Sequence, residues 1–190
     1  GRIIPTSVSI SSIRNESGES LGNVAVITDV SKLKEAETKL RDLAYRDALT
    51  GLPNFRLLSR QVRQLVSSLP VGTGRLAVLF IDLDQLKYVN DTYGHETGDA
   101  MIKSMASRLQ QVLPAGHLLC RRSGDEFIAV VDITAPGSEA ALRAILAAIN
   151  PVPVPIGSEH LLASATIGIS RLPQDSTNWQ ELQVCADVAM

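Results

Sequence analysis

Residues 121–127 read RRSGDEF and place a glycine and two adjacent carboxylates between two apolar segments. Aspartate and glutamate are poor strand formers, and a glycine within a strand pattern indicates a turn or a close approach of the backbone. The apolar run at 128–131 follows directly, which is typical of a buried strand. The segment therefore predicts a β-hairpin with Asp125 and Glu126 at its tip.

A second acidic group ends another apolar run. Residues 76–81 read LAVLFI, and Asp82, Leu83 and Asp84 follow them. Two strands that each end in carboxylates can bring those carboxylates together. Clustered carboxylate oxygens are hard ligands, and they suit Mg²⁺ that holds the phosphates of a nucleotide. The two acidic groups therefore predict one metal-dependent phosphate site.

The composition argues against several classes of function. Apolar residues make up 45% of the 190 residues and charged residues 20%, as in ordinary globular chains. The formal net charge is −2, so no general basic field recruits nucleic acid or a membrane. No apolar run approaches the roughly 20 residues that span a bilayer. Cys120 and Cys185 lie in apolar contexts without the spacing of a metal site, so we interpret both as buried thiols in a reducing compartment. We expect a cytoplasmic domain, which can belong to a larger, membrane-anchored protein.

The first 30 residues alternate in the manner of a β-hairpin, with a turn cluster at 15–19 and a second strand at 23–29. An isolated hairpin is marginally stable in water, so we expect it to end a domain whose earlier part is missing. The segment resembles the last two strands of a PAS sensor domain. Such domains commonly finish in Asp-Val-Ser before a helix, and here these residues are Asp29, Val30 and Ser31.

Residues 32–46 predict an amphipathic helix. Its apolar residues recur at spacings of three and four, at Leu33, Ala36, Leu40 and Leu43. This is the a/d pattern of a coiled coil, with lysine and glutamate around it. One interpretation is a helix that lies on its own domain, and the other is a short parallel coiled coil that makes the chain a dimer. We favour the coiled coil.

The rest of the chain alternates between helices and strands in the order α-β-α-β-β-α-β-α. We expect helices at 55–69, 100–113, 138–149 and from Trp179, and strands at 76–81, 118–121, 127–132 and 161–169. Asp99 is the expected cap of the second helix. A βαβ unit, a hairpin and a further αβ unit predict a mostly antiparallel sheet covered by helices, which is an α+β fold of the ferredoxin-like kind.

Residues 42–190 resemble a GGDEF domain, the family of diguanylate cyclases. Three stretches carry the resemblance, at 47–54 (DALTGLPN), 82–99 and 123–127 (SGDEF), and weaker matches lie at 166–169 and 185–190. Several matches in the right order are far more specific than one. The resemblance implies the palm-like sheet of nucleotidyl cyclases. It also implies a division into a PAS-like end (1–30), a signalling helix (31–46) and a GGDEF domain (47–190).

The family joins two GTP molecules into cyclic di-GMP and releases two pyrophosphates. Each domain holds one GTP and two domains face each other, so the resemblance implies a homodimer. It implies metal ligands at Asp82, Asp125, Glu126 and the backbone carbonyl of Leu83, with Mg²⁺ or Mn²⁺ as the ion. Asp125 and Glu126 would also serve the chemistry, Glu126 in the metal site or in activating the attacking hydroxyl.

The resemblance further implies where the nucleotide binds. Asn90 and Asp99 match the residues that recognise guanine, since a carboxylate and an amide can pair with its edge groups. Leu86 and Lys87 match positions near the phosphates, and Lys87 would act there as a catalytic cation. Gly124 lets the backbone pass close to the nucleotide. Asp99 could equally cap its helix, and Lys87 could be a solvated surface residue.

Three departures from the family pattern matter. Ser123 stands where the family has the first glycine, which adds a Cβ near the phosphates, and we expect activity to tolerate it. Leu86 replaces the usual phenylalanine, at little cost if the backbone binds the phosphates. Pro114 and His117 stand where many members have the arginine and aspartate that bind the product, so we expect no product inhibition through that site.

Two functions of different classes stay open. The first is a Mg²⁺-dependent diguanylate cyclase that an upstream sensor controls through the 31–46 helix. The second is a GTP-binding module that makes no product and tunes an adjacent EAL-type phosphodiesterase, because chains that read LAYxD, here at 43–47, often continue into such a domain. A third possibility is a dimerisation scaffold whose acidic residues no longer serve a function. In the family the last helix continues to basic residues beyond the position of Met190, so we expect the intact parent, rather than this chain, to be the complete enzyme.

Overall fold

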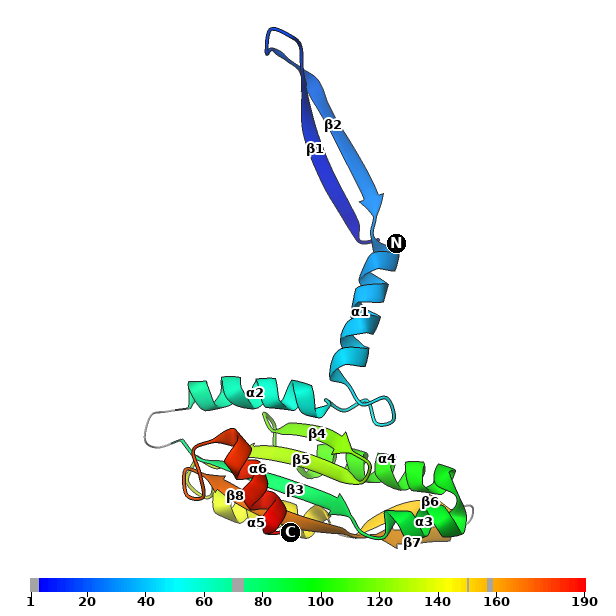
Figure 1. Ribbon diagram of the computed structural model, residues 1–190, viewed down its shortest axis with the longest axis vertical. Helices are drawn as coiled ribbons and strands as arrows, with labels where there is room; N and C mark the ends of the chain where they lie inside the picture. Colours follow the sequence, from blue (N-terminus) through cyan, green and yellow to red (C-terminus); the bar gives the residue numbers. More distant parts are fainter. Residues whose placement is uncertain (1–3, 70–73, 150, 157–158) are drawn as a thin grey trace. The chain divides into compact units, whose positions relative to one another are not determined.

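The computed structural model describes residues 4–69, 74–149, 151–156 and 159–190, and the chain divides into two units, Gly1–Ala44 and Tyr45–Met190 (Figure 1). In the first unit, β1 (Thr6–Arg14) and β2 (Ser20–Asp29) pair antiparallel, as the alternation predicts. The turn between them closes on Asn15, whose Oδ1 accepts from the backbone N–H of Glu19 at 2.8 Å. The hairpin buries none of its residues, since every position of both strands is exposed.

Helix α1 (Ser31–Tyr45) follows, one residue earlier at each end than predicted. Asp29 Oδ1 accepts a hydrogen bond from the N–H of Ser31 at 2.8 Å and so holds the start of the helix. The heptad leucines Leu33, Leu40 and Leu43 are 58%, 67% and 71% exposed. The heptad stripe is therefore not buried within the first unit.

The second unit is built on a four-stranded sheet in the order β4-β5-β3-β8, and all of its neighbouring pairs are antiparallel (Figure 1). The strands are β3 (Leu76–Leu83), β4 (Leu118–Ser123), β5 (Glu126–Asp132) and β8 (Ala165–Leu172). β3 is central, with β5 on one side and β8 on the other. This is the antiparallel α+β architecture that the sequence predicts.

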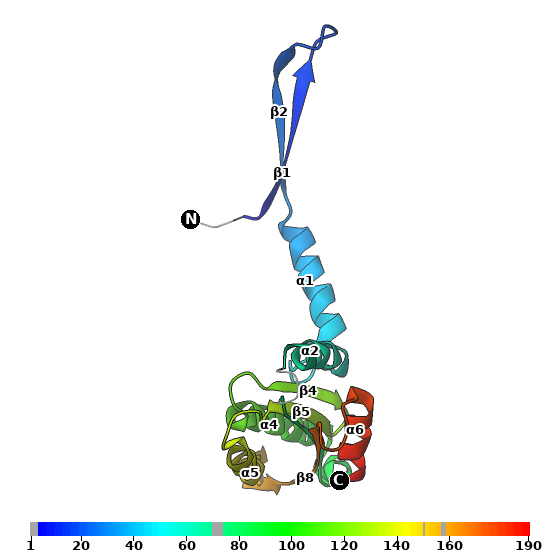
Figure 2. The same cartoon turned by 90° about the vertical axis from the view of Figure 1, so that its left-hand side faces the viewer.

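Alternation along β3 divides the core into two layers. Ala77, Leu79 and Ile81 face α3 (Leu86–Tyr93), α4 (His95–Val112) and α5 (Ser138–Ile149). Val78 and Phe80 face α2 (Phe55–Ser68) and α6 (Trp179–Val188). Figure 2 shows α5 and α6 on opposite sides of the sheet. Asn54 caps α2, as predicted, by accepting from the N–H of Leu57 at 3.1 Å.

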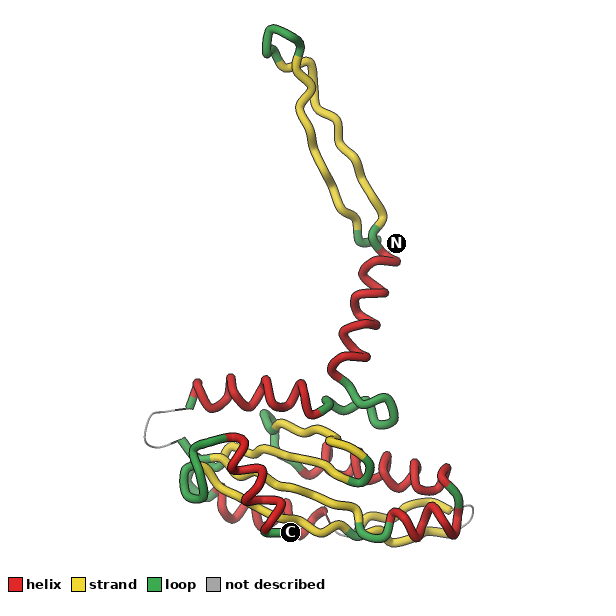
Figure 3. The backbone as a smooth tube through the Cα atoms, in the orientation of Figure 1, coloured by secondary structure: helices red, strands yellow, loops and turns green. Residues whose placement is uncertain are grey.

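The prediction of a single strand at 161–169 is wrong, because two strands occupy this region (Figure 3). β7 (Glu159–Ala163) ends before Ser164, whose carbonyl accepts from the N–H of Asp84 at 3.0 Å, and β8 begins after it. β7 pairs with β6 (Val152–Ile156), which lies in the stretch interpreted as a proline-rich connector. Among the residues that the structure describes, β6 and β7 form a two-stranded sheet, and a strand with a free edge tolerates prolines, which donate no hydrogen bond.

The start of the helix predicted at 100–113 is also wrong. α3 was not predicted, and α4 begins at His95, so Asp99 lies inside α4 and does not cap it. Gly94 separates the two helices with φ +85°, a conformation that suits glycine, and its N–H donates to the carbonyl of Asn90. The turn that ends α3 is therefore followed at once by a new helix.

Two further predictions concern the burial of the two cysteines and the presence of a membrane-spanning helix. Cys120 is a buried free thiol, and burial raises its pKa to about 12. Cys185 is also free but only partly buried, which corrects the expectation for it. Within the part of the chain that the structure describes, no helix has both the length and the apolar character needed to cross a membrane.

Candidate functional site

Four polar side chains form a row across one end of the sheet. Ser123 pairs with Glu126, Glu126 pairs with Asp82, and Asp82 pairs with Thr166, so the row crosses β4, β5, β3 and β8 in turn. Directly paired residues of neighbouring strands point to the same face of a sheet. These four side chains therefore lie on the face of Phe80, at the end of the layer that α2 and α6 cover.

The row is negatively charged at its centre. Burial, followed by the negative charges of Asp125, Glu126 and Asp84, raises the pKa of Asp82 above its ordinary value. Like charges that lie close together repel each other, and a cation bound among them would relieve the repulsion. The two acidic groups of the sequence are thus brought together, as predicted.

Asp84 has a structural role. Its Oδ2 accepts from Ser164 Oγ at 2.5 Å and its Oδ1 from Thr166 Oγ1 at 2.8 Å. Its backbone N–H donates to the carbonyl of Ser164. Both carboxylate oxygens are thus engaged in joining β3 to the start of β8, which leaves Asp82 as the acid of this pair that is available to a ligand.

The turn of the β4–β5 hairpin carries Asp125. Gly124 adopts φ +49° in this turn, which a residue with a Cβ rarely does. The carbonyl of Asp125 accepts from the N–H of Leu83 at 3.2 Å. This bond extends the pairing of β3 and β5 beyond Asp82 and fixes Asp125 next to the end of β3.

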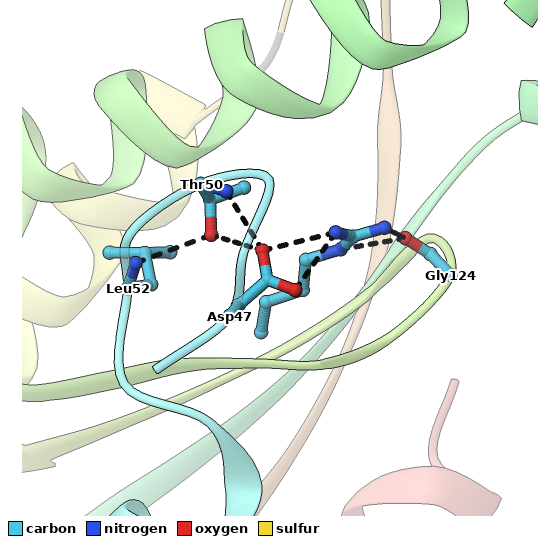
Figure 4. A network of polar contacts seen from close by, with 5 residues as sticks. Asp47, Thr50, Leu52 and Gly124 are labelled. Carbon is cyan, nitrogen blue, oxygen red and sulfur yellow. Dashed lines mark hydrogen bonds and ion pairs between the residues drawn. The ribbon is translucent and has the colours of Figure 1, made fainter. Parts of the chain in front are cut away.

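A polar network that was not predicted from the sequence supports the turn that carries Asp125 (Figure 4). Arg121 donates from Nη1 to both carboxylate oxygens of Asp47, at 3.0 and 3.1 Å. It also donates from Nε and Nη2 to the carbonyl of Gly124, at 3.0 and 2.8 Å. Asp47 in turn accepts from the N–H and hydroxyl of Thr50. The signal in the sequence is the Asp-x-x-Thr spacing of a side-chain-capped turn.

Arg122 occupies a β-bulge, since the register of β4 and β5 shifts between Arg121 and Ser123. Its guanidinium lies over the rings of Phe80 and Phe55, with Cζ at 5.1 and 5.9 Å from the ring centroids. Its Nη1 is 3.4 Å from Glu126 Oε2. Bulges re-aim side chains, and here the extra residue brings a cation to the acidic row.

The segment between β3 and α4 lies beside the row. Gln85 precedes α3 with φ +60°, and no side chain caps the first turn of α3 in the described structure. Leu86 is buried, so only its backbone is open to a ligand, whereas Lys87 is exposed. Backbone N–H groups of an uncapped first turn attract anions.

Asn90 and Asp99 lie on successive helices. A Cβ on Gly98 would come within 1.9 Å of Asn90 Oδ1, so the side chain of Asn90 rests on the bare backbone of α4. Asp99 follows Gly98 and is exposed. The structure thus places the predicted guanine-recognising residues on two packed helices, with Gly98 as the residue that the sequence analysis missed.

A preformed metal cage is absent from the described residues, where no three His, Cys, Asp or Glu side chains are already gathered around one point. Besides burial, the negative charges of Asp125 and Glu126 nevertheless raise the pKa of Asp82. Hard oxygen donors of this kind fit a divalent ion that also takes ligands from a phosphate. The set therefore fits an ion that enters together with a nucleotide.

An antiparallel sheet covered by helices, with acids at one end next to an uncapped helix start, defines a palm-like α+β domain. The model of the family "Diguanylate cyclase, GGDEF domain" matches residues 44–190. A crystal structure of a sensory box/GGDEF family protein from Caulobacter crescentus shares the fold with a TM-score of 0.70 and 34% identity, over 76% of this chain and 94% of that one. The chain belongs to the GGDEF-domain family.

Curated relatives differ in the activity that their names carry. The bifunctional diguanylate cyclase/cyclic di-GMP phosphodiesterase MucR of Pseudomonas aeruginosa is 36% identical over 160 residues, which are 84% of this chain and 23% of that protein. The cyclic di-GMP phosphodiesterase NbdA of the same organism is 31% identical over 161 residues, 85% of this chain and 21% of that protein. The chain spans less than a quarter of the length of these relatives.

Proposed function

We propose that this chain is the GGDEF part of a diguanylate cyclase, which joins two GTP molecules into cyclic di-GMP and releases two pyrophosphates. One observation carries the proposal: Asp82, Asp125 and Glu126 lie together at the end of the sheet, beside the uncapped start of α3. Carboxylates bind cations and a helix start binds anions, so the place suits a nucleotide triphosphate with its divalent ion.

Asp82, Asp125, Glu126 and the carbonyl of Leu83 would hold Mg²⁺ or Mn²⁺. When bound, the ion would neutralise phosphate charge and make the α-phosphate a better target for the attacking 3′-hydroxyl. Glu126 would help to activate that hydroxyl through its place in the metal site. Lys87 would balance the negative charge of the departing pyrophosphate.

Asn90 and Asp99 would recognise guanine by hydrogen bonds to its edge. The N–H groups of Leu86 and Lys87 would bind the phosphates at the first turn of α3. At Gly124 the positive φ and the missing side chain let the backbone of the turn approach the nucleotide.

Two GTP-loaded domains would have to face each other. The exposed heptad leucines of α1 support a homodimer through a parallel coiled coil, which an upstream PAS-like sensor would bias between productive and unproductive packing. The net charge of −2 gives no support for binding to nucleic acid or to a membrane.

The test uses the full-length parent with GTP and Mg²⁺, and cyclic di-GMP is detected by mass. We expect product from the wild type and from Glu139→Gln, which changes an acid remote from the row. Glu126→Gln should abolish product. Unchanged product in Glu126→Gln would show that the assigned chemistry is wrong.

The second candidate is a GTP-binding module that makes no product and regulates an adjacent EAL-type phosphodiesterase. Ser123 in the place of a family glycine and the similarity to NbdA favour it. It predicts saturable GTP binding that Asn90→Ala weakens, no cyclic di-GMP, and a phosphodiesterase rate that responds to GTP. Cyclic di-GMP made by the wild-type parent would contradict it.

A further inference from the structure

Ser123 contacts the acid that the proposed function places at the centre of the chemistry. It is the outermost member of the polar row and pairs directly with Glu126. Its Oγ donates to Glu126 Oε2 at 2.9 Å. A glycine, the family's residue at this position, offers no such hydrogen bond.

The second contact of this carboxylate ends on the same atom. Arg122 Nη1 lies 3.4 Å from Glu126 Oε2, a distance at which a hydrogen bond is weak. The guanidinium is itself placed by the rings of Phe80 and Phe55. Ser123 is therefore the shorter and better-formed of the two contacts.

The two contacts leave the other oxygen available. Among the described residues, the hydrogen bonds that Ser123 and Arg122 donate to this carboxylate both end on Oε2 and not on Oε1. A carboxylate that is held by one oxygen keeps its orientation while the other accepts a ligand. Groups that hydrogen-bond to a metal-binding carboxylate in this way set its orientation and strengthen metal binding.

We propose that Ser123 is a positioning residue that orients Glu126 for the divalent ion. The inference rests on the proposed function, because it takes Glu126 as part of the metal site. Ser123 does not touch the ion or the nucleotide in this role, and it acts only through Glu126. The serine that replaces the family glycine would therefore give the carboxylate of Glu126 a more fixed orientation.

The test measures binding of Mn²⁺ by electron paramagnetic resonance, on the full-length parent with a non-hydrolysable GTP analogue. Removal of the hydroxyl in Ser123→Ala should weaken Mn²⁺ binding about 10- to 100-fold, as loss of a hydrogen bond to a metal-binding carboxylate typically does. Ser123→Gly should do the same, and Ser123→Thr, which keeps the hydroxyl, should restore binding. Ser67→Ala on α2 is the matched control and should bind Mn²⁺ as the wild type does.

A second comparison separates orientation from a general structural effect. In the Glu126→Gln background, Ser123→Ala should cause no further loss, because the carboxylate it orients is gone. Equal Mn²⁺ affinity in wild type and Ser123→Ala, or equal loss in Ser123→Ala and Ser123→Thr, would overturn the positioning role alone. A wild-type protein that binds the analogue but no Mn²⁺ would overturn both this role and the metal site of the proposed function.

Discussion

Arg121 bonds to both carboxylate oxygens of Asp47 through a single nitrogen, although the two residues are 74 positions apart in the sequence. The same guanidinium donates two further hydrogen bonds to the carbonyl of Gly124, in the turn that carries Asp125. The ion pair is largely shielded from solvent, with side chains 12% and 22% exposed. The segment that leads from α1 into the second unit is thereby joined to the acidic turn.

Removal of one partner of this pair should be costly. We expect Arg121→Ala to lower the free energy of unfolding by about 2 kcal/mol, because it leaves the shielded carboxylate of Asp47 without its charged donor and removes two hydrogen bonds to the Gly124 carbonyl. The exposed pair of Arg171 and Glu139 gives the control, and Glu139→Ala should change stability by less than about 0.5 kcal/mol. Denaturant titration measures both, and equal losses in the two variants would contradict the distinction.

We expect Asp47 to contribute to the loss of stability of the protein at low pH. Burial opposes the effect, but hydrogen bonds from Thr50 and Arg121 outweigh it and lower the pKa of Asp47 below its ordinary value of 3.8. A carboxyl with a lowered folded pKa contributes stability above its unfolded pKa, and this contribution is lost as the pH falls through the folded pKa. Wild type should therefore lose more stability than Asp47→Asn between pH 4 and acid unfolding. Parallel pH profiles of the two proteins would refute this.

We expect Gly98 to strengthen nucleotide binding without touching the nucleotide. Gly98→Ala would place a Cβ 1.9 Å from Asn90 Oδ1, so the side chain of Asn90 must move. We expect the affinity for a fluorescent GTP analogue to fall about 10-fold, which corresponds to about 1.4 kcal/mol of overpacking strain. Ser104→Ala, on the same helix, should leave the affinity unchanged. Wild-type affinity in Gly98→Ala would show that the position of Asn90 is not critical.

We expect Asp82 to lower the stability of the metal-free domain and to be required for binding Mg²⁺ with a GTP analogue. Asp82→Asn removes one of four neighbouring negative charges, so we expect the metal-free domain to become more stable at neutral pH, by up to about 1 kcal/mol. The same variant should lose the stabilisation that Mg²⁺ with a GTP analogue confers on the wild type. Thermal unfolding with and without these ligands tests both parts. A less stable metal-free variant would argue against repulsion at the row.

Leu40 should matter for association and not for the folding of the single chain. It is 67% exposed on α1, so Leu40→Ser removes little buried surface. We expect the variant to shift a dimer of the parent toward monomer in sedimentation analysis, whereas Thr38→Ser on the polar side of the helix should not. A dimer that is unchanged by Leu40→Ser would exclude the heptad stripe as the interface.

Local patterns predicted much of this fold correctly. The hairpin tip at Gly124 and Asp125, the buried strand before Asp82 and the cap at Asn54 follow from glycine, apolar alternation and side-chain capping, which act over a few residues. α3 was missed because it is only 8 residues long and lies between a strand and Gly94. Short helices of this kind depend on tertiary packing more than on their own pattern.

The parts of the site that depend on distant partners were not visible in the sequence. Nothing local marks Arg121 as the partner of Asp47, and nothing at Ser164 shows that its contacts with Asp84 separate two strands. The bulge at Arg122 is likewise a property of the pairing of two strands. The acids themselves were predictable because the sequence places them at strand ends, whereas the contacts of Asp47 with Arg121 and of Asp84 with Ser164 join residues far apart in the sequence.

The row that runs from Ser123 through Glu126 and Asp82 to Thr166 takes one residue from each strand of the sheet. No partly assembled sheet contains the whole row, so a ligand that binds there recognises only the complete domain. Binding to the native state alone adds its free energy to global unfolding and leaves local fraying untouched. Hydrogen exchange in the sheet core, rather than at the helix ends, is where occupancy of this site would be seen.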